Sequence, residues 1–215
     1  VFRAEAKDGH IIQEDSATVV GGKFNSGALM LPACEFCDDV IGETSDLSIG
    51  DAWLPRFEAD VGGRNLLVVR NSIIHDILLN ASKKDKVKLN DILPEEVLAS
   101  QSGAYRQRRE GLSYRLERES VKGKWIPIKR IKTGEFNLTK VRKKIYDQRS
   151  QVTSLSREVF FKALKNNNYS IYEENLVGLT KKLRRNEILN MLPKVLINKT
   201  QRITMKFLSK IGIRS

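Results

Sequence analysis

The chain has 215 residues, of which 40% are hydrophobic and 30% are charged, enough to bury one good core and a second small one. Its two cysteines exclude a disulfide framework and fit a reducing compartment. No stretch approaches the roughly 18 consecutive apolar residues that span a bilayer, and the first residues lack the apolar segment of a signal peptide. We therefore expect a cytoplasmic protein and, because the chain begins at Val1 rather than at Met, a fragment or a processed product.

The formal net charge of +12 is distributed unevenly along the chain. Residues 1–60 carry −8, residues 61–100 carry +1 and residues 101–215 carry +19. This asymmetry indicates two functional halves, with the basic half facing an anionic partner. The partner would be an acidic protein or an anionic membrane surface, and the membrane surface would place the protein at the inner face of the membrane. An equally good interpretation is that Lys and Arg only keep the helices in solution.

Short strands are predicted in the first 70 residues. Phe2 to Lys7 alternates polar and apolar residues as a strand does, and Asp8-Gly9 fits a two-residue hairpin turn before a second strand. The β-branched run at residues 17–20 predicts another strand. The continuous apolar run at residues 66–69 is typical of a buried strand.

Helices are predicted from residue 71 onward. Apolar residues recur at helical spacing over residues 73–78 with Asn71 or Ser72 as the N-cap, and Pro94 lies in the first turn of another short helix. Residues 105–135 indicate a helix and then an irregular connector. Two basic amphipathic helices follow, the first ending at residues 166–168 and the second broken or kinked by Pro193.

These elements predict an α+β fold, with a mixed sheet and flanking helices in the N-terminal half and a basic helical C-terminal region. We expect three parts: an α/β region at residues 1–115, a connector at 116–136 and a basic helical region at 137–215. The last helix has an apolar side that either packs on the preceding helix or binds a membrane surface. Its residues are Leu179, Leu183, Ile188, Leu189, Leu192, Leu196, Ile203, Phe207, Leu208 and Ile211.

The sharpest local signal is the pair of thiols in Cys34-Glu35-Phe36-Cys37. Two thiols at this spacing can reach one metal ion or one edge of an iron–sulfur cluster. Two ordinary reduced cysteines and a redox pair are the alternatives, and nearby acids disfavour the redox pair because a reactive thiolate needs a cationic setting. His10 and His75 could complete a zinc site by residue type, but their spacing does not support it.

A second signal is the run Leu47-Ser48-Ile49-Gly50-Asp51-Ala52-Trp53. Gly50 lets the backbone approach a ligand closely, Asp51 can accept hydrogen bonds from a ligand, and Trp53 offers a flat stacking surface. The alternative is a strand that ends in a turn, with Trp53 in the core.

Taken together, the order of these motifs resembles the carboxy-terminal domain of coenzyme F420 hydrogenase/dehydrogenase beta subunits. In that family a CxxC lies shortly before an Asp-(Ile/Leu)-Ser-x-Gly-Asp signature, here residues 34–37 and 46–51. A Gly-x-Ser turn and a Val/Ile-rich strand then follow. The resemblance covers roughly residues 1–115. The turn departs from the family pattern, because it is Gly62-Gly63-Arg64 in this chain, and the basic region after residue 136 is not part of the signature.

The resemblance implies an iron–sulfur flavoprotein oxidoreductase. It would move electrons between a flavin (FAD or another flavin), a 4Fe-4S cluster and a hydride carrier such as coenzyme F420. Cys34 and Cys37 would be two of the four cluster ligands, and the other two would come from an upstream ferredoxin-like region or a redox partner. Bacterial relatives of this type are often encoded among genes for surface-polysaccharide biosynthesis. The residues that would form the flavin site are Ser48, Gly50, Asp51, Trp53, Gly62, Gly63 and Arg64.

Two other classes of function compete with this one. A non-catalytic interaction or membrane-surface module would use the basic amphipathic helices at the C-terminus. Nucleic-acid binding would also explain the +19 segment, but the sequence contains no recognised nucleic-acid motif, so we expect no nucleic-acid partner.

Overall fold

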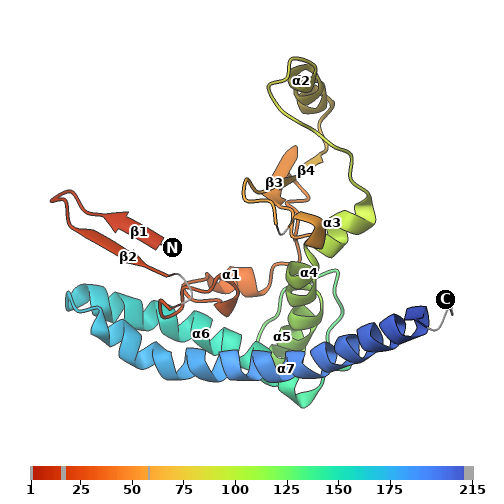
Figure 1. The fold of residues 1–215 in the computed structure, drawn as a ribbon. Coiled ribbons are helices and arrows are strands. Elements are labelled where there is room, and N and C mark those ends of the chain that lie inside the picture. Colours follow the sequence, from red (N-terminus) through yellow and green to blue (C-terminus); the bar gives the residue numbers. More distant parts are fainter. Residues whose placement is uncertain (1, 16–17, 58, 211–215) are drawn as a thin grey trace. The chain divides into compact units, whose positions relative to one another are not determined.

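The computed structural model describes residues 2–15, 18–57 and 59–210, and of residue 24 and residues 193–210 it describes the backbone only. The chain is about 51% helical and has a helical C-terminal half, which confirms the predicted α+β class. Its residues pack into two compact units, which are described separately (Figure 1). Unit 1 consists of Val1–Glu35 and Asn137–Ser215, and unit 2 consists of Phe36–Phe136.

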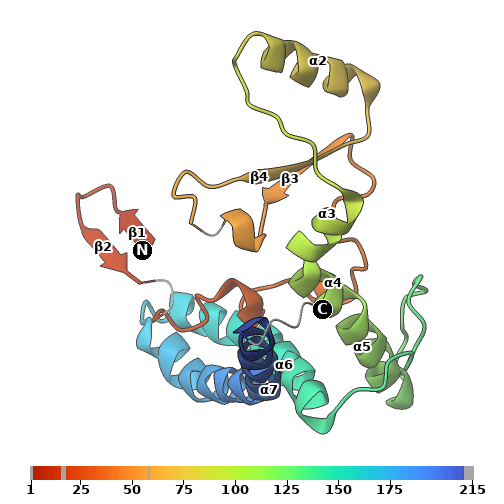
Figure 2. The ribbon, with the colours of Figure 1, turned by 45° about the vertical axis from the view of Figure 1, so that its right-hand side comes forward.

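Unit 1 is built on two long helices, α6 (Lys140–Lys165) and α7 (Ser170–Lys210), which lie side by side (Figure 2). The side chain of Thr139 caps α6 by accepting a hydrogen bond from the backbone N–H of Arg142, 3.2 Å away. Apolar side chains between the helices form two core clusters. The first contains Val159, Ala163, Tyr172 and Leu176, and the second contains Ile145, Val152 and Leu183.

The first 35 residues complete unit 1. Strands β1 (Phe2–Glu5) and β2 (Ile11–Glu14) form the predicted antiparallel hairpin, in which Phe2 pairs with Glu14. Its turn is one residue longer than predicted, because the N–H of Ala6 bonds to the carbonyl of His10 and leaves residues 7–9 in the loop. The short helices η1 (Phe24–Ser26) and α1 (Pro32–Glu35) both contact α6. Two buried hydroxyls hold this segment, since Thr153 donates to the carbonyl of Gly27 at 2.9 Å and Ser156 accepts from the N–H of Leu29 at 2.8 Å.

Unit 2 contains a second antiparallel hairpin, made of β3 (Leu47–Asp51) and β4 (Asn65–Val69). Its connection includes the short helix η2 (Pro55–Phe57). Helix α2 (Ser72–Lys83) follows, and the side chain of Asn71 caps it as predicted. Helices α3 (Pro94–Ser100), α4 (Ser102–Arg108) and α5 (Glu110–Val121) come next.

The irregular connector after α5 returns along this helix. The hydroxyl of Ser113 donates to the carbonyl of Lys132 at 2.7 Å and accepts from the N–H of Glu135 at 2.8 Å. At the other end of α5, the carboxylate of Glu119 contacts three basic side chains. They are Arg118 at 2.8 Å, Lys122 at 3.2 Å and Lys124 at 3.0 Å.

Three details differ from the sequence-based expectations. The strands form two separate antiparallel hairpins rather than one mixed sheet, because each strand pairs with its neighbour along the chain. In the run at residues 17–20, the described residues 18–20 form turns: the N–H of Thr18 bonds to the carbonyl of Asp15, and Val20 packs against the helices. Helix α7 continues through Pro193, so the predicted break is absent, and a kink there stays a prediction.

Candidate functional site

The two cysteines lie at and just after helix α1. Cys34 is exposed, Cys37 is half-buried, and both are free thiols. The thiol of Cys37 donates a weak hydrogen bond to the carbonyl of Asp39, 3.7 Å away. Among the described residues, no group of three or more His, Cys, Asp and Glu side chains could hold a metal ion.

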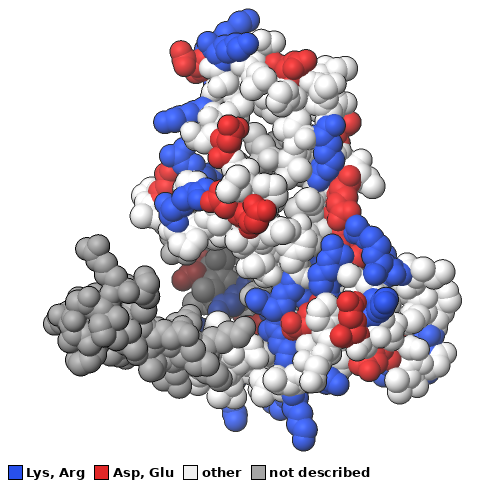
Figure 3. All heavy atoms as spheres, turned by 90° about the vertical axis from the view of Figure 1, so that its right-hand side faces the viewer, with Lys and Arg blue, Asp and Glu red and all other residues white. Residues whose placement is uncertain are grey.

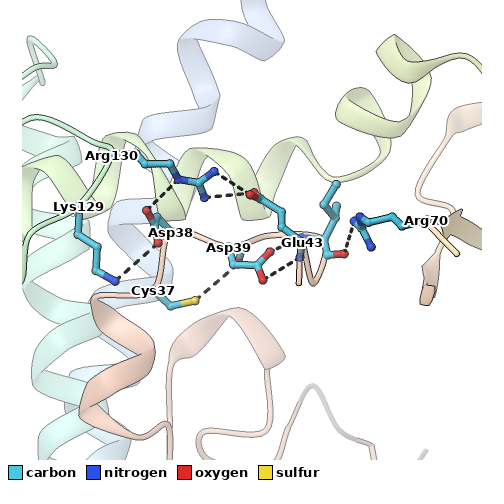
Figure 4. A network of polar contacts seen from close by, with 8 residues as sticks. Cys37, Asp38, Asp39, Glu43, Arg70, Lys129 and Arg130 are labelled. Carbon is cyan, nitrogen blue, oxygen red and sulfur yellow. Dashed lines mark hydrogen bonds and ion pairs between the residues drawn. The ribbon is translucent and has the colours of Figure 1, made fainter. Parts of the chain in front are cut away.

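The acidic loop directly after Cys37 is held by two basic side chains of the connector (Figure 4). Arg130 contacts Asp38 at 3.2 Å and Glu43 at 2.7 Å, and Lys129 lies 3.6 Å from Asp38. Asp39 instead accepts hydrogen bonds from two backbone N–H groups of its own loop, at 3.1 and 3.0 Å. These contacts tie the loop at residues 37–43 to the connector and to its own backbone.

These contacts change the electrostatics expected around the thiols. Burial alone raises the pKa of Asp38, but the hydrogen bond from Arg130 and the charge of Lys129 outweigh it and lower that pKa below its ordinary value. The pKa of Arg130 is raised by Glu43 and Asp38. The sequence indicated an acidic setting for Cys37, whereas the structure places two cations beside the acids.

A second group of polar contacts fixes the loop that leads into β3. The guanidinium of Arg70 donates to the carbonyls of Ser45 and Ile41, at 3.0 and 3.1 Å, and to the hydroxyl of Ser48 at 3.1 Å. The Ser48 hydroxyl also bonds to the carbonyl of Ile41. Ser48 therefore shapes this loop, and its hydroxyl is already engaged within the protein.

The end of β3 is open to solvent. The side chain of Trp53 is 70% exposed and that of Ile49 is 64% exposed. A Cβ atom added to Gly50 would meet nothing within 4 Å. The carbonyl of Asp51 accepts a hydrogen bond from Gln101 at 2.8 Å, while the residue itself is exposed. Trp53 therefore lies on the surface and not in the core.

The turn before β4 is closed by an aspartate. Asp60 accepts a hydrogen bond from the N–H of Gly62 at 3.0 Å and pairs with Arg64 at 2.6 Å. Gly63 has φ +70°, a conformation that favours glycine. The guanidinium of Arg64 is thus engaged within the turn.

All seven of the predicted flavin residues belong to the hairpin. Ser48, Gly50 and Asp51 lie on β3, and Trp53, Gly62, Gly63 and Arg64 lie in the connection to β4. Sequence reasoning missed the side chains that position this region: Arg70, Lys129, Arg130 and Asp60. Only Asp60 carries a local signal, because Asp two residues before Gly is a common turn pattern.

The N-terminal part of the chain matches one known family model. Residues 1–95 match the family model for the C terminus of coenzyme F420 hydrogenase/dehydrogenase beta subunits. This match confirms the predicted resemblance and ends at residue 95, short of the expected residue 115. No curated protein and no solved structure matches the chain. At the level of this domain, the chain therefore resembles part of an oxidoreductase.

Proposed function

We propose that the chain is part of an iron–sulfur flavoprotein oxidoreductase that moves electrons between a flavin, a 4Fe-4S cluster and a hydride carrier such as coenzyme F420. The observation that carries the proposal is the pair of free thiols directly before a hairpin that bears the family signature. A flavin accepts electrons in pairs and passes them singly to an iron–sulfur cluster.

The residues present fit both groups. Cysteine thiolates are the usual ligands of 4Fe-4S clusters, and free Cys34 and Cys37 provide two of the four. The other two ligands would come from elsewhere in the protein or from a redox partner. The open backbone at Gly50, the exposed face of Trp53 and the exposed Asp51 fit a flavin ring with its N–H and carbonyl groups.

In this proposal the surrounding residues act by positioning. Arg130 holds Asp38 and Glu43, so that the loop after Cys37 keeps one conformation. Arg70 and Ser48 hold the entry to β3 in the same way. Such rigid support keeps a ligand and a flavin contact at fixed positions, which electron transfer between two cofactors requires.

The test is iron per folded protein in the complete protein, purified without oxygen. Cys34→Ser and Cys37→Ser should each lower the iron content strongly, because a cluster rarely keeps its iron after the loss of one thiolate. Ala33→Ser, at an exposed neighbouring position, is the matched control and should leave the iron content unchanged. Wild-type iron in both cysteine variants would refute the cluster assignment.

Flavin content tests the hairpin separately. Asp51→Ala and Trp53→Ala should each reduce bound flavin while the fold is kept, since both side chains are exposed. Asp91→Ala removes the same charge at another exposed position and serves as the control. Unchanged flavin content in the Asp51 and Trp53 variants would show that these residues only form the hairpin surface.

A second candidate function is an interaction or membrane-surface module on α7. The apolar side of this helix packs on α6 at Leu179 and Leu183, but Ile188, Leu189 and Leu192 are each 45–47% exposed. The remaining members of the predicted apolar side, Leu196, Ile203, Phe207, Leu208 and Ile211, lie outside the residues whose side chains are described.

Helix hydropathy and surface charge both bear on this second candidate. Within the described residues, none of the helices has the length and apolar character to cross a membrane. On the face drawn in Figure 3, Asp and Glu side chains lie among the Lys and Arg side chains.

Vesicles with anionic lipids should retain the chain at low salt and release it as salt rises, because salt screens the attraction. Equal recovery from neutral and anionic vesicles would refute this second candidate.

A further inference from the structure

Unit 1 contains a pocket of about 280 Å³ between the segment at residues 18–26 and helix α7. Four apolar side chains line it, Val19, Val20, Val177 and Leu183, and Leu183 is almost completely buried. None of the predicted redox residues lines this pocket. The proposed redox function therefore does not account for this pocket.

The wall that faces α7 has a fixed shape. The hydroxyl of Ser26 donates to the carbonyl of Gly21 at 3.2 Å and accepts from the N–H of Ala28 at 3.3 Å. Gly21 has φ +77°, and a Cβ atom there would lie 2.9 Å from the Tyr172 hydroxyl oxygen. The backbone thus passes close to the helices at a position where only glycine fits, and the pocket is formed in advance.

The charged side chains that line the pocket are mostly basic. They are Lys23, Lys181 and Arg184, and among the described residues none of the three forms an ion pair. The one acid of the lining, Glu187, is paired with Arg149 at 2.6 Å. The lining therefore presents three uncompensated positive charges next to an apolar floor.

The sequence of α7 explains why these groups meet. Val177, Lys181 and Arg184 are spaced by four and three residues, so they share one face of the helix. Leu176, Leu179 and Leu183 pack toward α6. One stripe of α7 thus builds the core, and an adjacent stripe brings its positive charges to the pocket.

We propose that this pocket binds a small organic phosphate. The phosphate lies at Lys23, Lys181 and Arg184, and the apolar body of the ligand contacts Val20 and Val177. A phosphate group carries close to two negative charges and three acceptor oxygens, which matches three cations better than a carboxylate does. The volume is at the lower limit of small-molecule pockets, so a ligand with a single ring fits and a dinucleotide does not.

The test uses phenyl phosphate as the probe, titrated into the 215-residue chain by calorimetry and by NMR. It should bind with saturation, whereas phenol and inorganic phosphate should each bind at least about tenfold more weakly, since each lacks one half of the recognition. Inorganic phosphate that binds as tightly as phenyl phosphate would overturn the role of the apolar floor. A lipid headgroup could also supply a phosphate, and vesicles with phosphatidic acid test this source. Binding of the chain to these vesicles without binding of phenyl phosphate would overturn the proposal.

Neighbouring residues of α7 supply charge-matched variants. Lys181→Gln/Arg184→Gln removes two cations of the pocket, and Lys182→Gln/Arg185→Gln removes two exposed cations of the same helix that do not line it. The first variant should weaken phenyl phosphate binding about tenfold or more, because charge-assisted hydrogen bonds are lost. The second should change it less than about twofold. Equal weakening in both variants would show nonspecific attraction by a basic helix and would overturn the proposal.

Discussion

Replacement of Ser156 by Ala should loosen the segment that leads to the first cysteine. The Ser156 hydroxyl is fully buried on α6 and accepts the N–H of Leu29 at 2.8 Å. Leu29 has φ +61°, which is uncommon for a leucine and persists only where contacts hold it. A buried donor left without a partner costs about 1–3 kcal/mol, and the higher helix propensity of Ala recovers about 0.5 kcal/mol. Because Leu29 is itself 45% exposed, water can reach part of this site, and we expect a loss of about 1–2 kcal/mol.

Urea unfolding followed by circular dichroism measures this loss, because the signal is dominated by the long helices of unit 1. Ser154→Ala is the matched control, since Ser154 is exposed two positions away on the same helix, and its effect should stay within about 0.5 kcal/mol. Both tryptophans, Trp53 and Trp125, belong to unit 2, so their emission reports that unit separately. Indistinguishable midpoints for Ser156→Ala and Ser154→Ala would refute the role of this hydrogen bond.

Three further substitutions test other contacts. Arg130→Gln should speed amide exchange at residues 38–43 because their shared cation is lost; unchanged exchange there would contradict this role. The basic neighbours of Glu119 overcome the effect of its burial and lower its pKa from 4.5 to about 2. The ionised Glu119 therefore adds to the free energy of unfolding above pH 4.5, and this stabilisation is lost as the pH falls toward 2. It amounts to about 1–2 kcal/mol after solvent screening. The urea midpoint of Glu119→Gln should lack this pH dependence. Gly27→Ala should lower the free energy of urea unfolding by about 1–3 kcal/mol, because Gly27 has φ +83° and the new Cβ would lie 2.8 Å from the Thr153 hydroxyl. Gly103→Ala is the control, and it should cost nothing because a Cβ there meets open space.

Features with local signals were predicted well from the sequence. The hairpin at residues 2–14 follows from alternation around an Asp-Gly turn, and the start of α2 follows from Asn71 as an N-cap. The end of α6 at residues 166–168 follows from a run of asparagines. The family motif likewise consists of residues close together in the chain, so it could be recognised without a structure.

Features that depend on distant partners were not predicted. Arg130 meets Asp38 across 92 positions of the chain, and Thr153 meets Gly27 across 126. No periodicity encodes such pairs, because each is set by how whole elements pack. The run at residues 17–20 shows the same effect on a small scale. Its β-branched residues favour a strand, but the core of unit 1 takes up Val20 from a turn.

Packing also redistributes the charge that the sequence appeared to divide at residue 100. Unit 2 carries 17 Lys or Arg and 16 Asp or Glu, a net charge of +1, because the basic connector lies in the same unit as the acids that follow Cys37. Unit 1 carries 21 Lys or Arg and 10 Asp or Glu, a net charge of +11. Nearly the whole surplus therefore belongs to the unit that contains α6, α7 and the pocket, while the hairpin with the family signature belongs to a unit close to neutrality. Attraction of an anion grows with this local surplus, so an anionic ligand or surface should be recognised through unit 1.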